Sequence, residues 1–245
     1  MLSSLADVVK GHGFTTQVYN LTGALPMAYM DGNDASIMLV KNGAELFLNE
    51  DEGEVTSAAD SLFNEQQELD YDTKFYNTRQ RKTLNKRARY NTTFGECDIK
   101  HNDDYSIPTC HAFPPLLSKF RSGLSKLLGP KADDLKAEGN FYFEPKSGIG
   151  YHGDEERKVV ICLSLGSTST IRFNWRLPGT SEHTLPPTSI TCEHGDVYIM
   201  SEKATGWDWK MRSKVRVVHG AGSAKYIDSK KKKETGVKRK REARK

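Results

Sequence analysis

Six short apolar segments in the second half of the chain constrain its fold more than any other feature. Each is rich in Val, Ile, Phe or Tyr and is separated from the next by Gly, Pro or Ser, a pattern typical of β-strands joined by turns. The segments span residues 140–144, 158–164, 170–175, 189–191, 195–200 and 214–219. Closely spaced short strands are typical of a β-sandwich or barrel. We therefore expect an α+β fold with these strands at its core.

Two amphipathic helices are expected before these strands. Residues 57–69 place their apolar side chains on one stripe, with Ser57 or Thr56 available as an N-terminal cap. Residues 116–128 repeat Leu and Phe at helical spacing and are followed by Gly129-Pro130, which ends a helix. Both helices should pack against the sheet.

An Asn42-Gly43 pair predicts a β-hairpin near the N-terminus. It separates two apolar runs, residues 35–40 and 44–48, and Asn-Gly between β-prone runs favours a tight hairpin turn. We expect this N-terminal β-hairpin to add edge strands to a larger sheet.

Positive charge is concentrated at the C-terminus. The net charge is +4, but residues 230–245 hold ten Lys or Arg against two Glu, a net of +8, which leaves 4 − 8 = −4 elsewhere. Residues 229–245 have almost no apolar side chains, so they should be disordered. The clusters 230–233 and 238–241 are typical of a bipartite nuclear localisation signal or a nucleic-acid tether. We expect a nuclear protein, or a cytoplasmic one if the tail is only a tether.

The four cysteines favour free thiols. Cys97, Cys110, Cys162 and Cys192 form no CxxC pair, which argues against a structural zinc site. The chain has no run of about 18 apolar residues and no recognisable signal peptide. We expect a soluble intracellular monomer without membrane association.

His152 and Asp154 are candidate metal ligands. Residues two apart on a strand share a face, and an imidazole with a carboxylate supplies two ligands of a 2-His-1-carboxylate iron site. His219 is the preferred third ligand, because it lies in an apolar strand and is followed by small residues. The alternative is structural: His219 as a core histidine bonded to a backbone carbonyl, and Asp154 as a turn residue.

Residues 73–95 contain no Asp or Glu and interleave cations with aromatic rings. The cations are Lys74, Arg79, Arg81, Lys82, Lys86, Arg87 and Arg89, and the rings are Phe75, Tyr76, Tyr90 and Phe94. Cations neutralise phosphates and aromatic rings stack on bases, so this stretch is typical of a nucleic-acid surface. A solvated basic loop is the alternative.

The order of motifs resembles the AlkB-type branch of the Fe(II)/2-oxoglutarate dioxygenases. The matching motifs are Asn140-Phe-Tyr142, His152-Gly-Asp154 followed by Glu156, and the Ser-Leu-Gly and Arg-Phe strands within residues 161–173. The resemblance covers about residues 55–227. It implies a double-stranded β-helix (jelly-roll) core with flanking helices over residues 55–228, a β-rich extension at 1–54 and a tail at 229–245.

The resemblance also implies roles for individual residues. His152, Asp154 and His219 would bind Fe(II), and Asn140 and Tyr142 would contact 2-oxoglutarate. Oxygen would be activated as this cosubstrate loses carbon dioxide, and an alkyl group on a base of DNA or RNA would be hydroxylated and leave as an aldehyde. The residues expected to bind nucleic acid are Arg79, Arg87, Arg89, Tyr90, Phe94 and Glu156, with Tyr90 and Phe94 stacking on an extruded base.

One departure from this family concerns the cosubstrate anchor. The family ends with two arginines, the first of which binds the distal carboxylate of 2-oxoglutarate, but no arginine follows His219 before the tail. Lys225 is therefore the candidate anchor and Arg216 the fallback. Two other functions stay open: a protein side-chain hydroxylase or demethylase of the same fold, and a non-catalytic nucleic-acid-binding module on a degenerate oxygenase fold.

Overall fold

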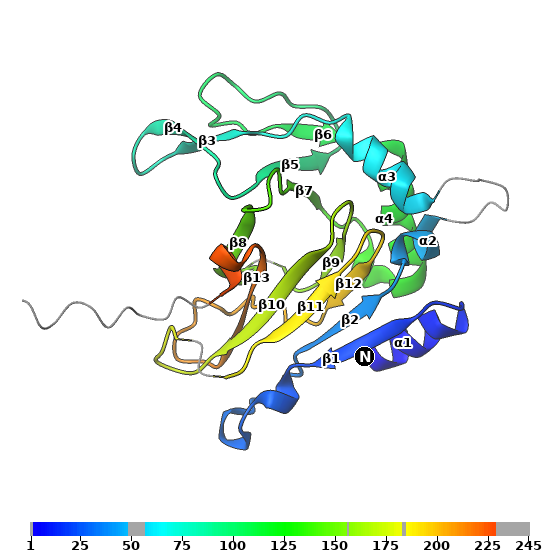
Figure 1. Ribbon diagram of the computed structural model, residues 1–245, viewed down its shortest axis with the longest axis vertical. Coiled ribbons are helices and arrows are strands. Elements are labelled where there is room, and N and C mark those ends of the chain that lie inside the picture. The colour runs from blue at the N-terminus through cyan, green and yellow to red at the C-terminus, as the bar shows by residue number, and fades with distance from the viewer. Residues whose placement is uncertain (1, 49–56, 156, 183–184, 229–245) are drawn as a thin grey trace, which may run out of the picture.

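Two four-stranded antiparallel sheets form the centre of the protein, as seen in a computed structural model that describes residues 2–48, 57–155, 157–182 and 185–228 (Figure 1). The first sheet has the order β1 (Thr16–Asn20), β2 (Ser36–Val40), β12 (Val197–Met200) and β9 (Val160–Leu163). The second has the order β11 (Thr188–Cys192), β10 (Ser169–Arg176), β13 (Arg216–Gly222) and β8 (Gly148–His152). This mixed architecture, rich in antiparallel strands, is compatible with a jelly-roll.

Strand β2 contributes to two hydrophobic cores, because successive side chains of a strand face opposite ways. Ile37 and Leu39 join Phe173 and Trp175 of β10 in the core between the two sheets. The alternate residues of β2 pack on the other side, under the helices. A strand buried on both faces is expected to be apolar throughout, as Ser-Ile-Met-Leu-Val nearly is.

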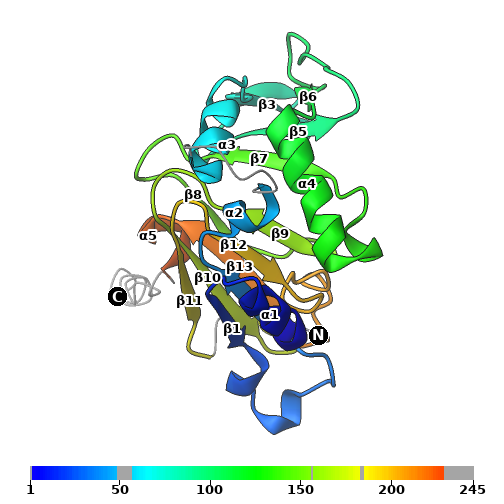
Figure 2. The same ribbon diagram turned by 90° about the vertical axis from the view of Figure 1, so that its right-hand side faces the viewer.

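Four helices cover the outer face of the first sheet: α1 (Leu2–Gly11), α2 (Gly43–Leu48), α3 (Ala58–Gln67) and α4 (Pro115–Leu128) (Figure 2). The two helices expected from sequence are confirmed as α3 and α4. Ser57 caps α3 by accepting a hydrogen bond from the Asp60 N–H at 3.2 Å, and Gly129 ends α4. Phe47 of α2 packs edge-on against Phe120 of α4, with ring centroids 5.3 Å apart.

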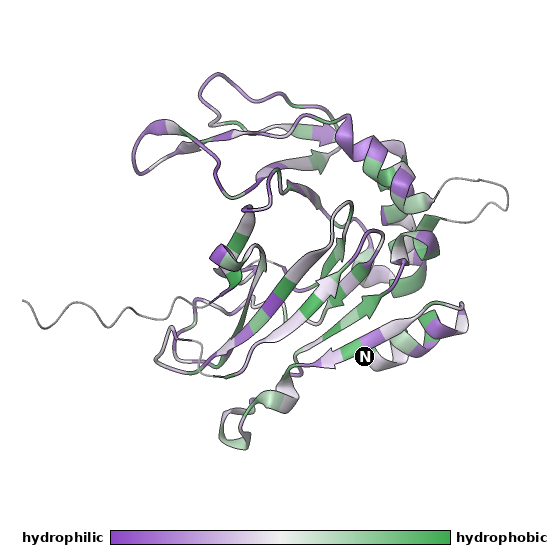
Figure 3. Cartoon of the chain, viewed as in Figure 1, coloured by the Kyte–Doolittle hydropathy of each residue, from purple (hydrophilic) through white to green (hydrophobic). Residues whose placement is uncertain are grey.

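A smaller lobe extends from the two sheets. Its three-stranded sheet has the order β6 (Cys110–Ala112), β5 (Tyr90–Gly95) and β7 (Ala137–Phe141), and β3 (Lys74–Asn77) pairs with β4 (Lys82–Asn85) as a hairpin. The hairpin is mostly hydrophilic, whereas apolar residues gather on the central strands and the inner faces of the helices (Figure 3). Strand β7 begins at Ala137, three residues before the segment 140–144 expected from sequence, because it pairs with β5.

The predicted N-terminal hairpin is wrong in its second half. Residues 43–48 form helix α2 because Ala44, Phe47 and Leu48 have helical spacing and bury one face. Strand β2 pairs with β1 on one side and with β12 on the other, so no edge is left for a strand at residues 44–48. Asn42 takes a positive φ of 52° at the turn between β2 and α2. Strand β2 does belong to a larger sheet, as expected, but it lies between β1 and β12 and not at the edge.

The remaining described elements are short: the 3₁₀ turns Thr22–Ala24, Met27–Tyr29 and Pro130–Ala132, and helix α5 (Ala224–Ile227). Among the described residues, no helix combines the length and apolar character needed to cross a membrane. The four cysteines are free thiols, as expected. The basic tail lies outside the described residues.

We expect Gly123→Ala in α4 to lower the free energy of unfolding by about 1–3 kcal/mol. An added Cβ would lie 2.6 Å from the Phe47 carbonyl oxygen, so α2 and α4 would have to separate. Where a helix has space for the added Cβ, a Gly→Ala change raises the free energy of unfolding by about 1 kcal/mol. Urea denaturation would measure the difference, with Gly11→Ala as the control because nothing lies within 4 Å of that Cβ. A stabilised Gly123→Ala variant would contradict the prediction.

Candidate metal centre

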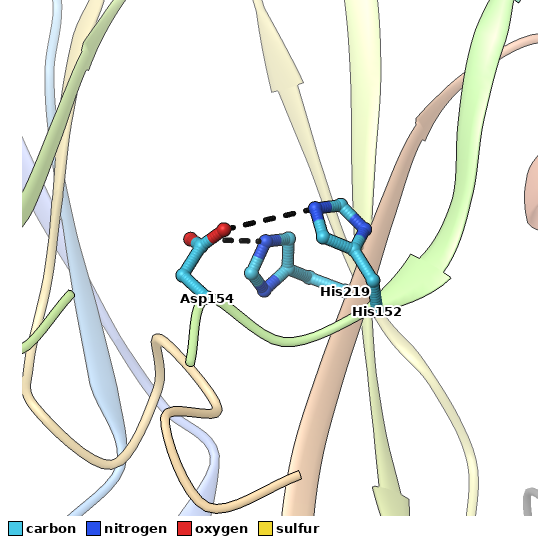
Figure 4. A group of neighbouring side chains, drawn as sticks. All are labelled: His152, Asp154 and His219. Atoms are coloured by element: carbon cyan, nitrogen blue, oxygen red, sulfur yellow. Dashed lines mark ion pairs between the residues drawn. The ribbon is translucent and has the colours of Figure 1, made fainter. Parts of the chain in front are cut away.

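His152, Asp154 and His219 meet at one end of the second sheet (Figure 4). His152 is the last residue of β8 and lies directly opposite His219 of β13 in the antiparallel pair, with ring centroids 4.6 Å apart. Asp154 follows β8 and points back at both rings. The His152 Nε2 atom lies 3.7 Å from Asp154 Oδ1, and the His219 Nε2 atom lies 3.5 Å from Asp154 Oδ2.

Glycines allow the two histidine strands to approach each other. The pairing of β8 with β13 is irregular between His219 and Ala221. A Cβ on Gly220 would lie 3.0 Å from the Ile149 carbonyl oxygen, and one on Gly222 would lie 2.5 Å from the Gly148 Cα atom. Gly222 also takes a φ of +95°, which favours glycine. The small residues noticed after His219 therefore have a structural reason.

The two imidazoles present Nε2 toward Asp154. The Nδ1 atom of His152 lies 2.8 Å from the Gly150 carbonyl oxygen, and because a carbonyl only accepts, Nδ1 carries the proton and Nε2 has a free lone pair. Burial, reinforced by His152 and Arg157, lowers the pKa of His219 to about 3, so this ring is neutral near pH 7. Its Nδ1 atom has no hydrogen-bond partner among the described residues.

The donor set fits a divalent transition metal. The Nε2-to-carboxylate separations are too long for good hydrogen bonds. The three ligand atoms nevertheless lie within 4.8 Å of one another, so a single ion could contact all of them. Burial raises the pKa of Asp154, while His152 and Arg157 oppose that rise. Two imidazoles and one carboxylate with further positions open are the ligands that suit Fe(II).

A turn-rich segment, residues 201–214, supports Asp154 from the side. The Asp154 N–H donates to the Thr205 carbonyl at 2.9 Å. Gly153 fits closely against this segment, because an added Cβ would lie 2.2 Å from the Gly206 carbonyl oxygen and 2.7 Å from the Trp209 Cβ atom. The glycine between His152 and Asp154 is therefore required by packing.

Residues predicted to contact the cosubstrate divide into two groups. Asn140 lies on β7 and accepts a hydrogen bond from Arg89 Nε, and Tyr142 follows on the same face of the strand. Burial raises the pKa of Tyr142 to about 12, with Arg89 among the nearby charges. Glu138, also on this face, accepts a hydrogen bond from Arg157 at 2.9 Å. Arg89 and Arg157 thus form, with Glu138, a charged rim beside Asp154.

The two predicted anchor cations do not face the triad. Arg216 is buried and donates to the carbonyl oxygens of Leu177 and Thr180, at 3.2 and 2.6 Å. It lies three residues before His219 on β13, so its side chain leaves the opposite face of the sheet. Lys225 is exposed on α5, with its Nζ 5.0 Å from the Tyr226 ring centroid.

Helix α5 itself lies on the outer face of the second sheet. Phe173 faces the inter-sheet core, so its neighbour Arg172 faces outward, where it binds the Ile227 carbonyl and the Asp228 carboxylate at 3.2 and 2.6 Å. The assignments of Lys225 and Arg216 are therefore corrected: strand alternation turns Arg216 to the face opposite His219, and Lys225 lies on α5 at the outer face of the sheet.

The residues predicted to bind nucleic acid are distributed around the small lobe. Arg79 and Arg87 are exposed, the first in the turn between β3 and β4 and the second after β4. Tyr90 stacks on Phe143 with centroids 4.1 Å apart, so one face of its ring is occupied. Phe94 is buried against Phe113 and His111, so its role in base stacking is corrected to a packing role. Glu156 lies outside the described residues.

Sequence reasoning missed two contributors to the site. Arg157 follows Asp154 by three residues, a spacing that could have identified it. The Thr205 carbonyl had no sequence signal, because any residue can supply a backbone oxygen.

We expect His152→Ala, Asp154→Ala and His219→Ala each to weaken Ni(II) binding by more than about 100-fold, because each removes a ligand rather than a supporting group. Isothermal titration calorimetry on the full chain would measure the affinity. His111→Gln on β6 is the matched control, since its ring binds the Asp70 carbonyl instead. Unchanged affinity in His219→Ala would mean that another residue is the third ligand.

We expect the metal-free protein to lose stability as the pH falls from about 6.5 toward about 3. The unfolded chain protonates His219 in this range and the folded chain does not, so unfolding takes up a proton. The free energy of unfolding of the wild type should change with pH more steeply than that of His219→Gln, by up to about 1.4 kcal/mol per pH unit. Urea midpoints in chelator-containing buffers would measure it. Equal slopes would show that His219 titrates normally when folded.

Two comparisons with known proteins agree with this geometry. A family model described as the 2OG-Fe(II) oxygenase superfamily matches residues 48–206, more than half of the chain. This range includes His152 and Asp154, whereas His219 lies beyond it. The chain is also 31% identical over 234 residues to an uncharacterized protein of Acanthamoeba polyphaga mimivirus, covering 91% of this chain and 87% of that protein. The chain therefore belongs to the 2OG-Fe(II) oxygenase superfamily of dioxygenase-type oxidoreductases, whose activity requires Fe(II), 2-oxoglutarate and O2.

Proposed function

We propose that this protein oxidatively removes alkyl groups from nucleobases in DNA or RNA, using an AlkB-like site on a double-stranded β-helix core. The observation that supports this substrate most directly is the junction at Arg89. Its guanidinium contacts Asn140 and Glu138 beside the metal ligands, while the chain on either side of it forms the basic and aromatic surface of the small lobe. A substrate bound to that surface would lie next to the triad.

The small lobe offers features that suit a polynucleotide. A hollow of about 590 Å³ between the β3–β4 hairpin and α5 is lined by Phe75, Arg87 and Tyr226, among others. Phe75 is 39% exposed, and the nearby Lys74, Arg79, Arg81 and Lys82 are exposed cations. Phosphates would pair with these cations and an unstacked base could lie on the ring.

The residues around the triad suit a small dicarboxylate. Because the pKa of Tyr142 is raised, its hydroxyl stays protonated at neutral pH and can donate to a carboxylate. Arg89, held by Asn140, is the cation that we propose as the carboxylate partner in place of Lys225 and Arg216. When bound, Fe(II) with 2-oxoglutarate and O2 supplies the oxidising chemistry. The protein fixes the ligands, binds the cosubstrate and positions the alkylated base.

We propose that the basic tail directs the protein to the nucleus or tethers it to nucleic acid, and that the protein acts as a monomer. A cytoplasmic location follows if the tail is only a tether. The assignments of the tail depend on its charge pattern alone.

One structural observation favours a second candidate, the non-catalytic nucleic-acid-binding module. Neither of the cations expected to anchor 2-oxoglutarate faces the triad. If Arg89 does not serve in their place, the chain would bind nucleic acid without turnover. Succinate formation by the iron-loaded wild type, lost in His219→Ala, would exclude this module.

We expect two sets of arginine substitutions to have different effects on the iron-loaded enzyme. The double change Arg79→Gln with Arg87→Gln should lower demethylation of a methylated oligonucleotide by more than about tenfold, because it removes phosphate partners. It should leave substrate-free succinate formation unchanged, because neither residue contacts the triad. Arg89→Gln should lower both, mainly by raising KM for 2-oxoglutarate.

Lys10→Gln, exposed on α1, is the control for these assays, and it matches the single charge lost in Arg89→Gln. Full oligonucleotide turnover by the double variant would contradict the role of the hairpin. A methylated peptide oxidised in place of the oligonucleotide would indicate a protein side-chain hydroxylase or demethylase. Product formation would be followed by mass spectrometry at several salt concentrations, since phosphate contacts weaken as salt rises.

A further inference from the structure

Lys203 is an almost fully buried cation that the proposed chemistry does not use. Its side chain is 3% exposed, and its Nζ donates to Asp208 at 2.8 Å, to Asp31 at 2.9 Å and to the Val215 carbonyl at 2.8 Å. An ammonium group has three protons, so these acceptors satisfy it completely. A buried charge with complete pairing fixes the positions of the groups around it.

The segment that Lys203 holds is the one that contacts Asp154. The Gly206 N–H donates to the Lys203 carbonyl at 3.2 Å, so Lys203 and Thr205 belong to one tight turn. Thr205 is completely buried, and its hydroxyl lies 2.8 Å from both the Arg157 and the Glu202 carbonyl oxygens, which share its single proton, while its own carbonyl accepts from Asp154 N–H at 2.9 Å. Two hydrogen bonds thus join this turn to both ends of the residue 154–157 loop.

The third partner of Lys203 comes from the N-terminal part of the chain. Asp31 precedes β2, outside the range matched by the family model. The same region is attached to the start of segment 201–214 by two hydrogen bonds, from Ser201 N–H to the Ser36 carbonyl and from Ser36 N–H to the Ser201 side-chain hydroxyl, both 2.9 Å. The N-terminal residues therefore reach the metal ligand through one buried ion cluster.

We propose that Lys203 is a positioning residue for the metal centre. With Asp31 and Asp208 it forms a clamp that holds the Thr205 carbonyl against Asp154, and so sets where the carboxylate faces the two histidines. The N-terminal segment becomes part of the metal centre through Asp31. This inference rests on the proposed role of Asp154 as a metal ligand.

The clamp predicts which change harms metal binding. Lys203→Met keeps the length of the side chain but leaves Asp208 buried without its cation, so the turn should shift and carry Asp154 with it. Asp31→Asn removes one charge from a partner that is 33% exposed, so the fold should survive. Groups that orient metal ligands typically affect metal affinity by 10- to 100-fold.

Two matched controls separate positioning from general destabilisation. Lys41→Met breaks a comparable pair, with the fully buried Asp196 at 2.5 Å, but at the opposite end of β2. Asp34→Asn changes the neighbouring carboxylate, whose hydrogen bonds within the described residues come from the Thr22 and Ser36 hydroxyls of its own segment. The Asp34 backbone carbonyl accepts from the Ser201 hydroxyl at 3.1 Å, and the Asn variant keeps that bond.

The experiment is a Co(II) titration of the full chain followed by visible absorption, with melting temperatures measured in parallel. We expect the dissociation constant to rise at least about tenfold in Lys203→Met and several-fold in Asp31→Asn, and to stay within twofold of wild type in both controls. If Lys203→Met does not fold, the proposal is tested by comparing the Co(II) dissociation constant of Asp31→Asn with that of its control, Asp34→Asn. Equal affinity in that pair overturns the role of Asp31.

Wild-type affinity in a folded Lys203→Met variant overturns the clamp, while the metal centre stands. Failure of the wild type itself to bind Co(II) overturns the metal centre and the clamp together. A rise in dissociation constant that Lys41→Met shares would show that the effect comes from lost stability, and it would also overturn the proposal.

Discussion

The direct pairing of His152 with His219 is the constraint on which the rest of the structure depends. It joins residues far apart in the chain and places both rings on the face that Phe173 also occupies, at the inter-sheet core. A shift of one residue in this register would turn one ring to the outer face. The two sheets, the glycines of β8 and β13, and the buried turn beside Asp154 all serve to keep that register and complete the ligand set.

Local periodicity predicted the parts of the fold that depend on local sequence. Ser57 and Gly129 marked the ends of helices because capping chemistry is local. His152 and Asp154 were found because strand alternation requires nothing beyond neighbouring residues. The Asn42-Gly43 signal failed because both edges of β2 are taken by β1 and β12, which lie before and far after it in the chain. Tertiary pairing overrode a correct local turn signal.

The residues of the site, like the elements of the fold, were predictable only where neighbouring residues carry the signal. His219 could be selected by its apolar setting, but Lys225 and Arg216 were chosen for charge and order in the chain. Strand alternation turns Arg216 away from the triad, and Lys225 lies on α5 at the outer face of the sheet. Arg89 was assigned to nucleic acid from its basic neighbours, whereas the pairing of β5 with β7 brings it to Asn140. Phe94 was misassigned for the same reason: whether an aromatic ring is exposed depends on tertiary packing, which the local sequence does not show.

Charge explains why the metal ligands need support from distant segments. Burial of Asp154 raises its pKa, because the charged carboxylate loses contact with water. The positive charges of Arg157 and Arg89 on the rim oppose this rise. Glu138 pairs with both guanidiniums, at 3.8 Å from Arg89 and 2.9 Å from Arg157. Lys203 cannot serve in this way, because Asp31 and Asp208 already neutralise it. One set of cations therefore tunes the carboxylate electrostatically, while a separate, neutralised cluster fixes its position.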